Sequence, residues 1–443
     1  MKIIIAGAYE IGSHLAKLLS RNDHDIVLMD ESEEKLENIS PDYDLLTMHA
    51  SPSSLKALKS AGAEHADLYI AVTPDESMNM NSCVMAKAVG AKKTVAKVNN
   101  YEFVEPELTK FFDKLGIDSL IYPENLAATD IVNGLKMSWV RQRWDVHGGA
   151  LVMLGIKLRE TCEILNQPLK DLCKPDSPYY IVAIRRDGET IIPRGDDSLH
   201  VYDMAYFMVT KQYIPYVRKI VGKEHYVDVK NVMVMGGGDT AIRALKNMPE
   251  YMNVKIIERD EARCDYLNEH IDNRNVMVIN GDGRDLSLLN EEGIRNTQAF
   301  VALTTNAETN ILACLTAKRM GVRKTVAAVE NLDYVNMAVS LDIGTIVNKK
   351  AIAASRIYQM MLETEVDNVS YLMTANAHVA EFVAQPQSKV TRKKVFELGL
   401  PKGATIGGLV RNGVGYLVSG GTQIEAGDIV VGICYQQRLD KLE

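Results

Sequence analysis

The chain repeats itself once, and this repeat limits its fold more than any other feature of the 443 residues. Two polar positions near the end of an expected strand, Thr73 and Asn79, recur 231 residues later as Thr304 and Asn310. A second set recurs at an offset of 225, pairing Gly188, Gly195 and Asp203 with Gly413, Gly420 and Asp428. Solenoid repeats are far shorter, so this period indicates one ancestral two-domain unit written twice in tandem.

The larger part of each copy alternates apolar strands with helical patterns. In the first copy, we expect strands at residues 2–6, 25–29, 43–48, 66–72 and 94–98. Strands that alternate with helices at this spacing predict a doubly wound, Rossmann-like parallel sheet, which binds ligands outside the carboxyl ends of its strands. The fold class is therefore α/β, with one such sheet in each copy.

The smaller part of each copy has another pattern. A long helical pattern over residues 124–143 leads to residues 150–209, where short alternating strands are separated by turns at Asp187-Gly188 and Gly195-Asp196. This pattern predicts a small α+β, β-rich domain. The predicted order is a Rossmann-like domain over residues 1–140, a β-rich domain over 141–222, a second Rossmann-like domain over 228–365 and a second β-rich domain over 366–443.

A glycine-rich turn, Gly236-Gly237-Gly238-Asp239-Thr240-Ala241, opens the second copy between an apolar strand and a helical pattern. Such a turn lets backbone amides and a helix N-terminus face a pyrophosphate, and an acid about 20 residues on can hold a ribose. Glu258 ends the next expected strand. The alternative is a tight turn that packs a helix on a sheet without a ligand. The predicted contacts in this half are Gly236, Gly238, Asp239, Thr240, Ala241, Glu258, Asp282 and Thr304.

The first copy begins with a related turn, Gly7-Ala8-Tyr9-Glu10-Ile11-Gly12, followed by Asp30 at the end of the next strand. Tyr9 stands where the middle glycine of such a turn permits close approach of a pyrophosphate. Two alternatives stay open here, a nucleotide site and a purely structural turn. The predicted contacts in this half are Gly7, Ala8, Tyr9, Glu10, Ile11, Gly12, Asp30, Ser51 and Thr73.

Composition excludes several classes of protein. The net charge of −8 and the pI near 5.7 argue against nucleic-acid binding. No apolar run is long enough to span a membrane, and the chain starts directly on an expected strand, so we expect a cytoplasmic protein. The six cysteines are scattered without a Cys-x-x-Cys pair, which favours reduced thiols over disulfides or a metal site.

The chemistry of the two turns favours sensing over catalysis. Asp30 and Glu258 would repel a 2′-phosphate, so NAD(H) or ATP/ADP is expected ahead of NADP. A dehydrogenase also needs a domain that places a proton donor against the nicotinamide, and we identify in the sequence of neither copy a histidine with a paired carboxylate or a lysine in an obvious pocket context. We therefore expect no catalytic residues, with an NAD-dependent oxidoreductase as the alternative. Asp239 would repel a phosphate unless it points away or Arg243 or Arg284 compensates.

These features together resemble the TrkA family of regulatory subunits of Trk potassium uptake systems, which are built from tandem regulator-of-potassium-conductance (RCK) units. The resemblance is carried by GAYEIG with Asp30, GGGDTA with Glu258, the GDGRD stretch at residues 281–285, the two Thr-Asn strand ends and the doubled domain order. The sequence departs from the family in two places: Tyr9 stands in place of a glycine, and His49-Ala50-Ser51 stands in place of the usual Gly-Asp-Ala.

The resemblance implies a function for the whole chain. It implies a cytosolic, nucleotide-binding subunit that gates a Trk-type potassium channel or transporter by ligand-dependent conformational change. NAD(H) is the implied ligand, with adenine nucleotides beside it. The implied assembly is a homo-oligomer, a tetrameric ring at the inner face of the cell membrane, bound to an integral membrane partner.

Overall fold

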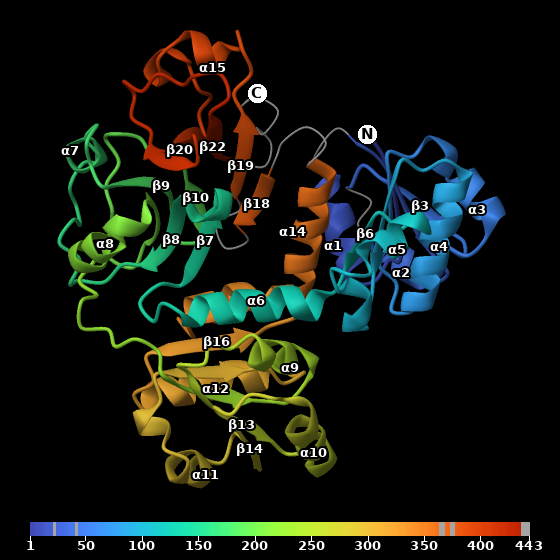
Figure 1. Ribbon diagram of the computed structural model, residues 1–443, viewed down its shortest axis with the longest axis horizontal. Helices are drawn as coiled ribbons and strands as arrows, with labels where there is room; N and C mark the ends of the chain where they lie inside the picture. Colours follow the sequence, from blue (N-terminus) through green and yellow to red (C-terminus); the bar gives the residue numbers. More distant parts are fainter. Residues whose placement is uncertain (21–23, 40–42, 363–367, 373–376, 436–443) are drawn as a thin grey trace. The chain divides into compact units, whose positions relative to one another are not determined.

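The computed structural model describes residues 1–20, 24–39, 43–362, 368–372 and 377–435, and it contains four β-sheets (Figure 1). The chain forms two compact units. The first consists of Met1–Ala127 with Lys349–Met361, and the second consists of Ala128–Asn348 with Leu362–Glu443. A helical segment from late in the sequence therefore completes the first unit.

The first unit is built on a six-stranded parallel sheet of order β3-β2-β1-β4-β5-β6. Its central strand, β1, has no exposed side chain from Ile3 to Ala6, as expected for a parallel strand covered on both faces. In chain order the elements are β1 (Lys2–Ala6), α1 (Glu10–Leu19), β2 (Asp25–Asp30), α2 (Glu33–Glu37), β3 (Leu46–His49), α3 (Leu55–Ser60), β4 (Leu68–Ala71), α4 (Glu76–Val89), β5 (Lys93–Lys97), α5 (Thr109–Lys114), β6 (Ser119–Ile121), the start of α6 (Pro123–Leu135), and α14 (Lys349–Leu362) up to Met361.

The second unit contains a parallel sheet of the same topology, in the order β14-β13-β12-β15-β16-β17. Its elements are β12 (Asn231–Met235), α9 (Asp239–Lys246), β13 (Asn253–Glu258), α10 (Glu261–His270), β14 (Val276–Asn280), α11 (Leu286–Glu291), β15 (Ala299–Ala302), α12 (Ala307–Arg319), β16 (Lys324–Ala328), α13 (Leu332–Ser340) and β17 (Thr345–Val347). The identical strand order confirms that the sequence repeat is a repeat of structure.

Two antiparallel sheets complete the second unit. The first has the order β10-β9-β11-β8-β7 and the second has the order β18-β19-β22-β20-β21. The strands are β7 (Gln142–Val146), β8 (Leu151–Lys157), β9 (Tyr179–Arg186), β10 (Glu189–Ile191), β11 (Met204–Val209), β18 (Asn368–Leu372), β19 (Ala377–Val383), β20 (Ala404–Arg411), β21 (Val414–Leu417) and β22 (Ile429–Tyr435), with helices α7 (Leu169–Leu172), α8 (Ile214–Ile220) and α15 (Lys389–Arg392) beside them.

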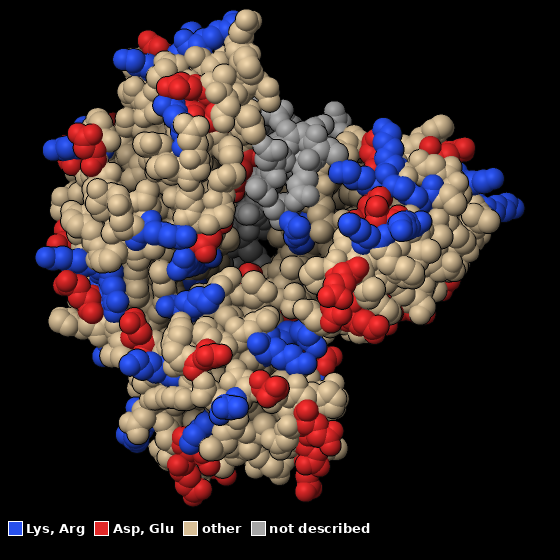
Figure 2. Space-filling model, viewed as in Figure 1, with Lys and Arg blue, Asp and Glu red and all other residues tan. Residues whose placement is uncertain are grey.

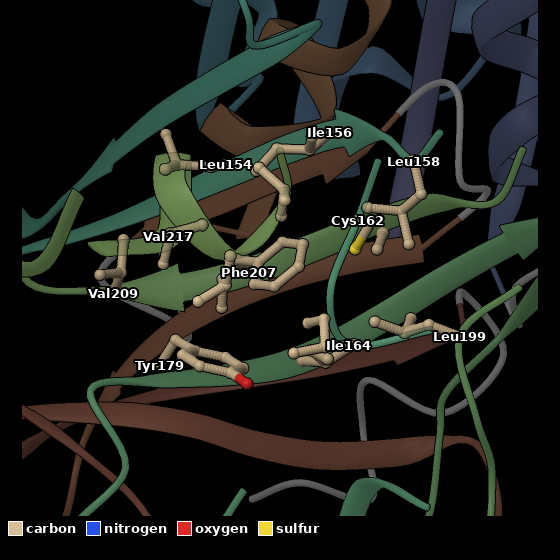
Figure 3. Close-up of a cluster of buried hydrophobic side chains, with 14 of the residues drawn as sticks. Leu154, Ile156, Leu158, Cys162, Ile164, Tyr179, Leu199, Phe207, Val209 and Val217 are labelled. Atoms are coloured by element: carbon tan, nitrogen blue, oxygen red, sulfur yellow. The ribbon is translucent and has the colours of Figure 1, made fainter. Parts of the chain in front are cut away.

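Each face of the first antiparallel sheet has a core. On one face, Phe207 lies among buried aliphatic side chains and near Tyr179, whose ring centroid is 5.6 Å away (Figure 3). On the other face, side chains such as Met153 and Tyr206 form one cluster with Val379 and Val431 of the second antiparallel sheet. Burial on both faces explains why the central strands β8 and β11 are apolar at nearly every position.

The two antiparallel domains also repeat an ion pair. Arg186 donates two hydrogen bonds to the Asp203 carboxylate, at 2.9 and 2.8 Å, and Arg411 does the same with Asp428, at 2.8 and 2.7 Å. The Asp428 carboxylate also accepts the Glu425 amide at 2.8 Å. Two-pronged pairs of this kind fix the geometry of a hairpin as well as its charge, because both partners are held by two bonds.

We predict that Asp428→Asn lowers the free energy of unfolding of the second antiparallel sheet by about 2 kcal/mol, because the charged partner of Arg411 is lost from a buried site. The measurement is urea unfolding followed by hydrogen exchange of β20 and β22. Glu425→Gln is the control: Glu425 also contacts Arg411, but its side chain is 63% exposed, so the loss should stay below about 0.5 kcal/mol. Equal losses for both variants would contradict the prediction.

One predicted element is wrong in its extent. The helix expected over residues 124–143 ends at Leu135, and β7 already begins at Gln142. Val140 and Trp139 are buried in the core of the first antiparallel sheet, and the Arg141 amide donates to the Gly155 carbonyl at 2.8 Å. Sheet pairing and core packing therefore override the helical periodicity of this stretch.

The predicted fold class is confirmed, since two Rossmann-like parallel sheets alternate along the chain with two β-rich domains. The boundaries drawn in the sequence remain predictions, and the boundary between 365 and 366 and the chain end at 443 lie outside the described residues. On the face that Figure 2 shows, Lys and Arg side chains are interspersed with Asp and Glu.

Candidate functional site

The second glycine-rich turn connects β12 to α9 and leaves its backbone open. Gly236 has a φ of 99°, and a Cβ there would lie 3.0 Å from the Leu303 carbonyl carbon and the Thr304 nitrogen. Glycine is thus required at this position. Gly238 is the N-cap of α9, and a Cβ there would meet no atom within 4 Å. The turn therefore passes close to β15 on one side and faces open space on the other.

Glu258 ties this turn to the end of the neighbouring strand. Its carboxylate accepts the Gly237 amide at 2.6 Å and the Asp260 amide at 2.9 Å, one on each oxygen. Each carboxylate oxygen has two acceptor positions, so capacity remains for a hydroxyl group. The predicted ribose acid thus lies next to the turn, where a ligand at the helix N-terminus would reach it.

The acid in the turn, Asp239, is compensated by a residue that sequence reasoning missed. Arg263, in the first turn of α10, places Nη2 2.7 Å from Asp239 Oδ1 and donates from Nε to the Gly237 carbonyl at 2.7 Å. Arg284, one of the two arginines considered for this role, instead pairs with Asp282 at 2.6 Å. That hydrogen bond lowers the pKa of Asp282 to about 2.

A cavity of about 360 Å³ lies against this turn, at the carboxyl ends of the strands. Five predicted residues line it: Gly236, Gly238, Glu258, Asp282 and Thr304. Three arginines that were not among the predicted ligand contacts also line it: Arg259, Arg263 and Arg284. The remaining lining residues are Met235, Gly237, Ile257, Asp260, Gly281, Gly283, Leu303, Thr305, Asn306 and Thr309. An anion in this cavity would meet a helix N-terminus and Arg259, while Arg263 and Arg284 also lie in the lining but are paired with Asp239 and Asp282.

Three predicted residues of the turn, Asp239, Thr240 and Ala241, do not line the cavity. Asp239 is turned toward Arg263, and Ala241 is buried where α9 packs on the sheet. Thr240 is half-buried in the first turn of α9, and neither it nor Ala241 lines the cavity. A small residue at position 241 therefore serves helix–sheet packing, the third role of such a fingerprint.

Thr304 and Thr73 share one arrangement. Thr304 donates from its amide and its hydroxyl to Asn310 Oδ1, at 3.1 and 2.7 Å, and Thr73 does the same with Asn79 Oδ1, at 2.9 and 2.7 Å. The asparagine amides return a bond to the threonine carbonyl, at 2.9 Å in both halves. Each Thr-Asn pair is thus a bracket that holds the strand end beside the start of the next helix.

The first turn has the same backbone path but a different surface. Gly7 has a φ of 110°, and Asp30 accepts the Ala8 amide at 2.7 Å and the Ser32 amide at 2.8 Å. Tyr9 occupies the N-cap of α1, the position of Gly238 in the second half. The Lys35 ammonium lies 3.3 Å from the centre of the Tyr9 ring and 3.9 Å from Asp30. A side chain and its cation therefore flank the first turn.

The other predicted residues of the first half are spread around this turn. Glu10 forms an ion pair with Lys350 of α14. Ile11 and Gly12 are buried, and a Cβ on Gly12 would overlap the Gly7 carbonyl oxygen at 1.9 Å. Ser51 follows β3, and its hydroxyl accepts the Ser53 amide at 3.4 Å. Within the ranges that the structure describes, no group of three or more His, Cys, Asp or Glu is placed to hold a metal.

Two dinucleotide-type parallel sheets, each followed along the chain by a β-rich domain, define a tandem RCK-fold protein. A crystal structure of the GsuK RCK domain superposes with a TM-score of 0.60 at 15% identity, covering 100% of this chain and 94% of that one. The GsuK channel bound to NAD superposes with a TM-score of 0.61, covering 99% of this chain and 78% of that one, at 15% identity. These similarities establish the fold.

Sequence comparison identifies the family. The TrkA-N domain family matches residues 3–123 and 232–349, and the TrkA-C domain family matches residues 379–443. The Trk system potassium uptake protein TrkA of Haemophilus influenzae is 31% identical over 97% of this chain and 95% of that protein. A TrkA homolog of Archaeoglobus fulgidus is 28% identical over 100% and 99%. The chain belongs to the TrkA family, as the resemblance in its sequence predicted.

Proposed function

We propose that this chain is the nucleotide-binding regulatory subunit of a Trk-type potassium uptake system, and that its principal ligand site is the second glycine-rich turn. The observation that carries the proposal is the cavity beside Gly238, which combines a helix N-terminus without a side-chain cap, the Glu258 carboxylate beside the turn, and three arginines, two of them paired with aspartates. A dinucleotide or adenine nucleotide needs these groups, since its phosphates are anionic and its ribose presents hydroxyls. The name of the Haemophilus relative, a potassium uptake protein, supports the transport role.

The ligand class follows from the charges. We propose NAD(H) as the ligand, with ATP and ADP as the alternatives, because Glu258 can accept from a ribose hydroxyl and would repel a 2′-phosphate. The first turn is proposed to be structural, because Tyr9 and Lys35 flank the place that a pyrophosphate needs. One nucleotide per chain is the expected stoichiometry.

The partner and the location belong to the same proposal. Along the described ranges, no helix has the length and hydrophobicity needed to cross a membrane. We propose that the chain assembles as a ring of four at the inner face of the membrane and binds an integral membrane subunit there. Ligand binding would then act through its difference in affinity between two conformations, about 1 to 3 kcal/mol for each coupled site.

The test is calorimetric titration of NAD, NADH, ATP and ADP into the purified chain. Glu258→Ala is expected to weaken binding by about 10- to 100-fold, because a charged hydrogen bond to the ribose contributes about 1.5 to 3 kcal/mol. The matched variant in the first half, Asp30→Asn, should leave affinity and stoichiometry unchanged. A Glu258→Ala protein with undiminished affinity would show that the site lies elsewhere.

A second assay separates sensing from catalysis. The purified chain is incubated with NADH and small carbonyl substrates, and absorbance at the nicotinamide band is followed. We expect no oxidation of NADH in this assay. In a separate pull-down from solubilised membranes, we expect a membrane subunit to co-purify with the chain. Oxidation of NADH at enzyme-like rates would instead establish the alternative, an NAD-dependent oxidoreductase.

A further inference from the structure

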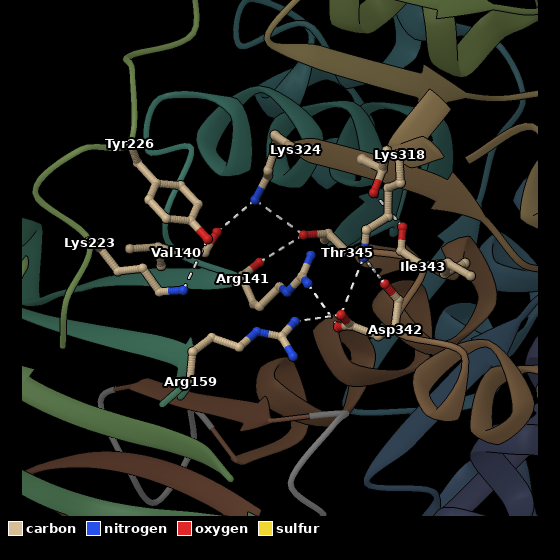
Figure 4. A network of polar contacts seen from close by, with 11 residues as sticks. Val140, Arg141, Arg159, Lys223, Tyr226, Lys318, Lys324, Asp342, Ile343 and Thr345 are labelled. Carbon is tan, nitrogen blue, oxygen red and sulfur yellow. Dashed lines mark hydrogen bonds and ion pairs between the residues drawn. The ribbon is translucent and has the colours of Figure 1, made fainter. Parts of the chain in front are cut away.

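A buried lysine joins the second parallel sheet to the first antiparallel sheet. Lys324 is the first residue of β16 and is 1% exposed. Its ammonium nitrogen donates to the Val140 carbonyl at 2.6 Å and to the Thr345 hydroxyl at 3.2 Å (Figure 4). The Thr345 hydroxyl in turn donates to the Arg141 carbonyl at 3.0 Å. Two side chains of the parallel sheet thus cap two backbone carbonyls directly before β7.

The acceptors of Lys324 are neutral, and the nearest ion pairs are made by other residues. The Asp342 carboxylate accepts from Arg141 at 2.9 Å, from Arg159 at 2.5 Å and from Lys318 at 3.2 Å (Figure 4). One carboxylate is therefore shared by three cations, and Lys324 adds a fourth basic group beside them. A buried ammonium is costly to keep charged without an anionic partner.

The first half of the chain provides an internal comparison. Lys93 begins β5 and pairs in register with Leu68, just as Lys324 begins β16 and pairs with Ala299. Lys93 is half-buried, whereas Lys324 is fully buried. The same position of the repeated fold is thus more deeply buried in the second half, where Lys324 contacts the segment before β7.

We propose that Lys324 is a proton-sensitive joint: the neutral amine holds the second parallel sheet onto the first antiparallel domain, and protonation loosens this contact. The neutral amine still donates hydrogen bonds to Val140 and Thr345, so closure needs no charge. The protonated form must place a desolvated positive charge beside Arg141, and opening the joint hydrates it.

The direction of the pH dependence follows from linkage. Burial, and then the charge of Arg141, lower the pKa of Lys324 to about 7, whereas an exposed lysine titrates near about 10.4. Closing the joint therefore releases a proton between these two values, so the joint tightens as pH rises through this window and is weakest below about pH 7. The equilibrium constant for closing the joint therefore increases by at most about tenfold per pH unit.

The other charged groups at the joint are accounted for as follows. Burial raises the pKa of Asp342, but the charges of Arg141, Lys318 and Arg159 outweigh it and lower this pKa to about 2, so the carboxylate stays ionised. Burial lowers the pKa of Lys157 at the end of β8. Burial acts to raise the pKa of Tyr226, but the hydrogen bond from Lys223 and nearby cations lower it. Tyr226 therefore needs its own control.

The experiment is hydrogen–deuterium exchange of the full chain from pH 6 to 9, read at residues 137–141 and 342–345 after correction for the intrinsic exchange rate. Wild-type protection at both segments should rise by up to about tenfold per pH unit above pH 7. In Lys324→Met, protection should be high and independent of pH. Lys93→Met, at the equivalent strand position, and Tyr226→Phe should keep the wild-type slope.

These measurements are made without nucleotide, so their outcome tests the Lys324 proposal independently of the proposed function. Flat wild-type protection, or an unchanged slope in Lys324→Met, would overturn it, as would loss of the slope in Tyr226→Phe. If Lys324→Met fails to fold, NMR of lysine-labelled wild-type protein reads the Lys324 amine directly. Titration near pH 7 supports the joint, and titration near about 10.4, as for an exposed lysine, overturns it.

Discussion

Gly238→Tyr is expected to weaken NADH binding by at least about 100-fold, the equivalent of about 3 kcal/mol. Gly238 lines the cavity at the N-terminus of α9, and a Cβ there meets no atom within 4 Å, so the substitution fills ligand space without disturbing the fold. The φ of −68° suits any residue. The introduced ring would stand at the helix N-cap, the position that Tyr9 holds in the first half, and would keep the phosphates from the backbone amides.

Calorimetry with NADH measures the loss, and circular dichroism with a thermal melt checks that the protein is folded. The reciprocal variant, Tyr9→Gly, is the control, because it alters the equivalent position of the first turn and should leave binding at the second turn within about twofold of wild type. A folded Gly238→Tyr protein that binds NADH with wild-type affinity would place the nucleotide outside this cavity.

Gly344→Ala is expected to lower the free energy of unfolding of the second parallel sheet by about 3 kcal/mol or more. Gly344 has a φ of 122°, and a Cβ there would lie 2.2 Å from the Thr325 carbonyl oxygen. Backbone strain of about 1 to 2 kcal/mol therefore adds to a backbone clash that only a shift of β16 or β17 relieves. Urea unfolding followed by pulsed hydrogen exchange of the β16 amides measures the effect.

Gly321→Ala separates strain from the clash. Gly321 also has a positive φ, 102°, but a Cβ there meets no atom within 4 Å. Its substitution should cost about 1 to 2 kcal/mol, the strain of a side chain in this conformation without a clash. If the two variants lose the same stability, the close approach of Gly344 to Thr325 does not limit this sheet.

The sequence predicted the parts of the fold that depend on local pattern. Alternating strands and helices, the glycine turns and the offset of 231 residues are all readable along the chain, and the two parallel sheets of identical order confirm them. The Thr-Asn brackets at Thr73 and Thr304 also follow from the repeat, although their hydrogen bonds needed the structure. The sequence predicted too long a helix for α6, because core packing at Trp139 and strand pairing at Arg141 depend on distant residues.

The sequence predicted only those residues of the candidate site that lie within one strand–turn–helix–strand segment at a known spacing. The turn at Gly236 and the acid at Glu258 are 22 residues apart on consecutive strands, so a spacing rule finds them. Arg263 lies on the following helix and compensates Asp239 through space, and no spacing rule covers that contact. A signal was nonetheless present: an arginine in the first turn of the helix after the acid. The contact of Lys35 with Tyr9 is missed for the same reason.

Strand β16 connects Lys324 with the wall of the candidate nucleotide cavity. At its last residue, the Ala328 carbonyl accepts the Asn310 side-chain amide at 2.8 Å, and Asn310 brackets Thr304 at the wall of the cavity. At its first residue lies Lys324, about 13 Å away along an extended chain that does not stretch. If both proposals hold, a proton at Lys324 and a nucleotide beside Thr304 would act at opposite ends of this one strand, so a single structural element would respond to pH and to the ligand.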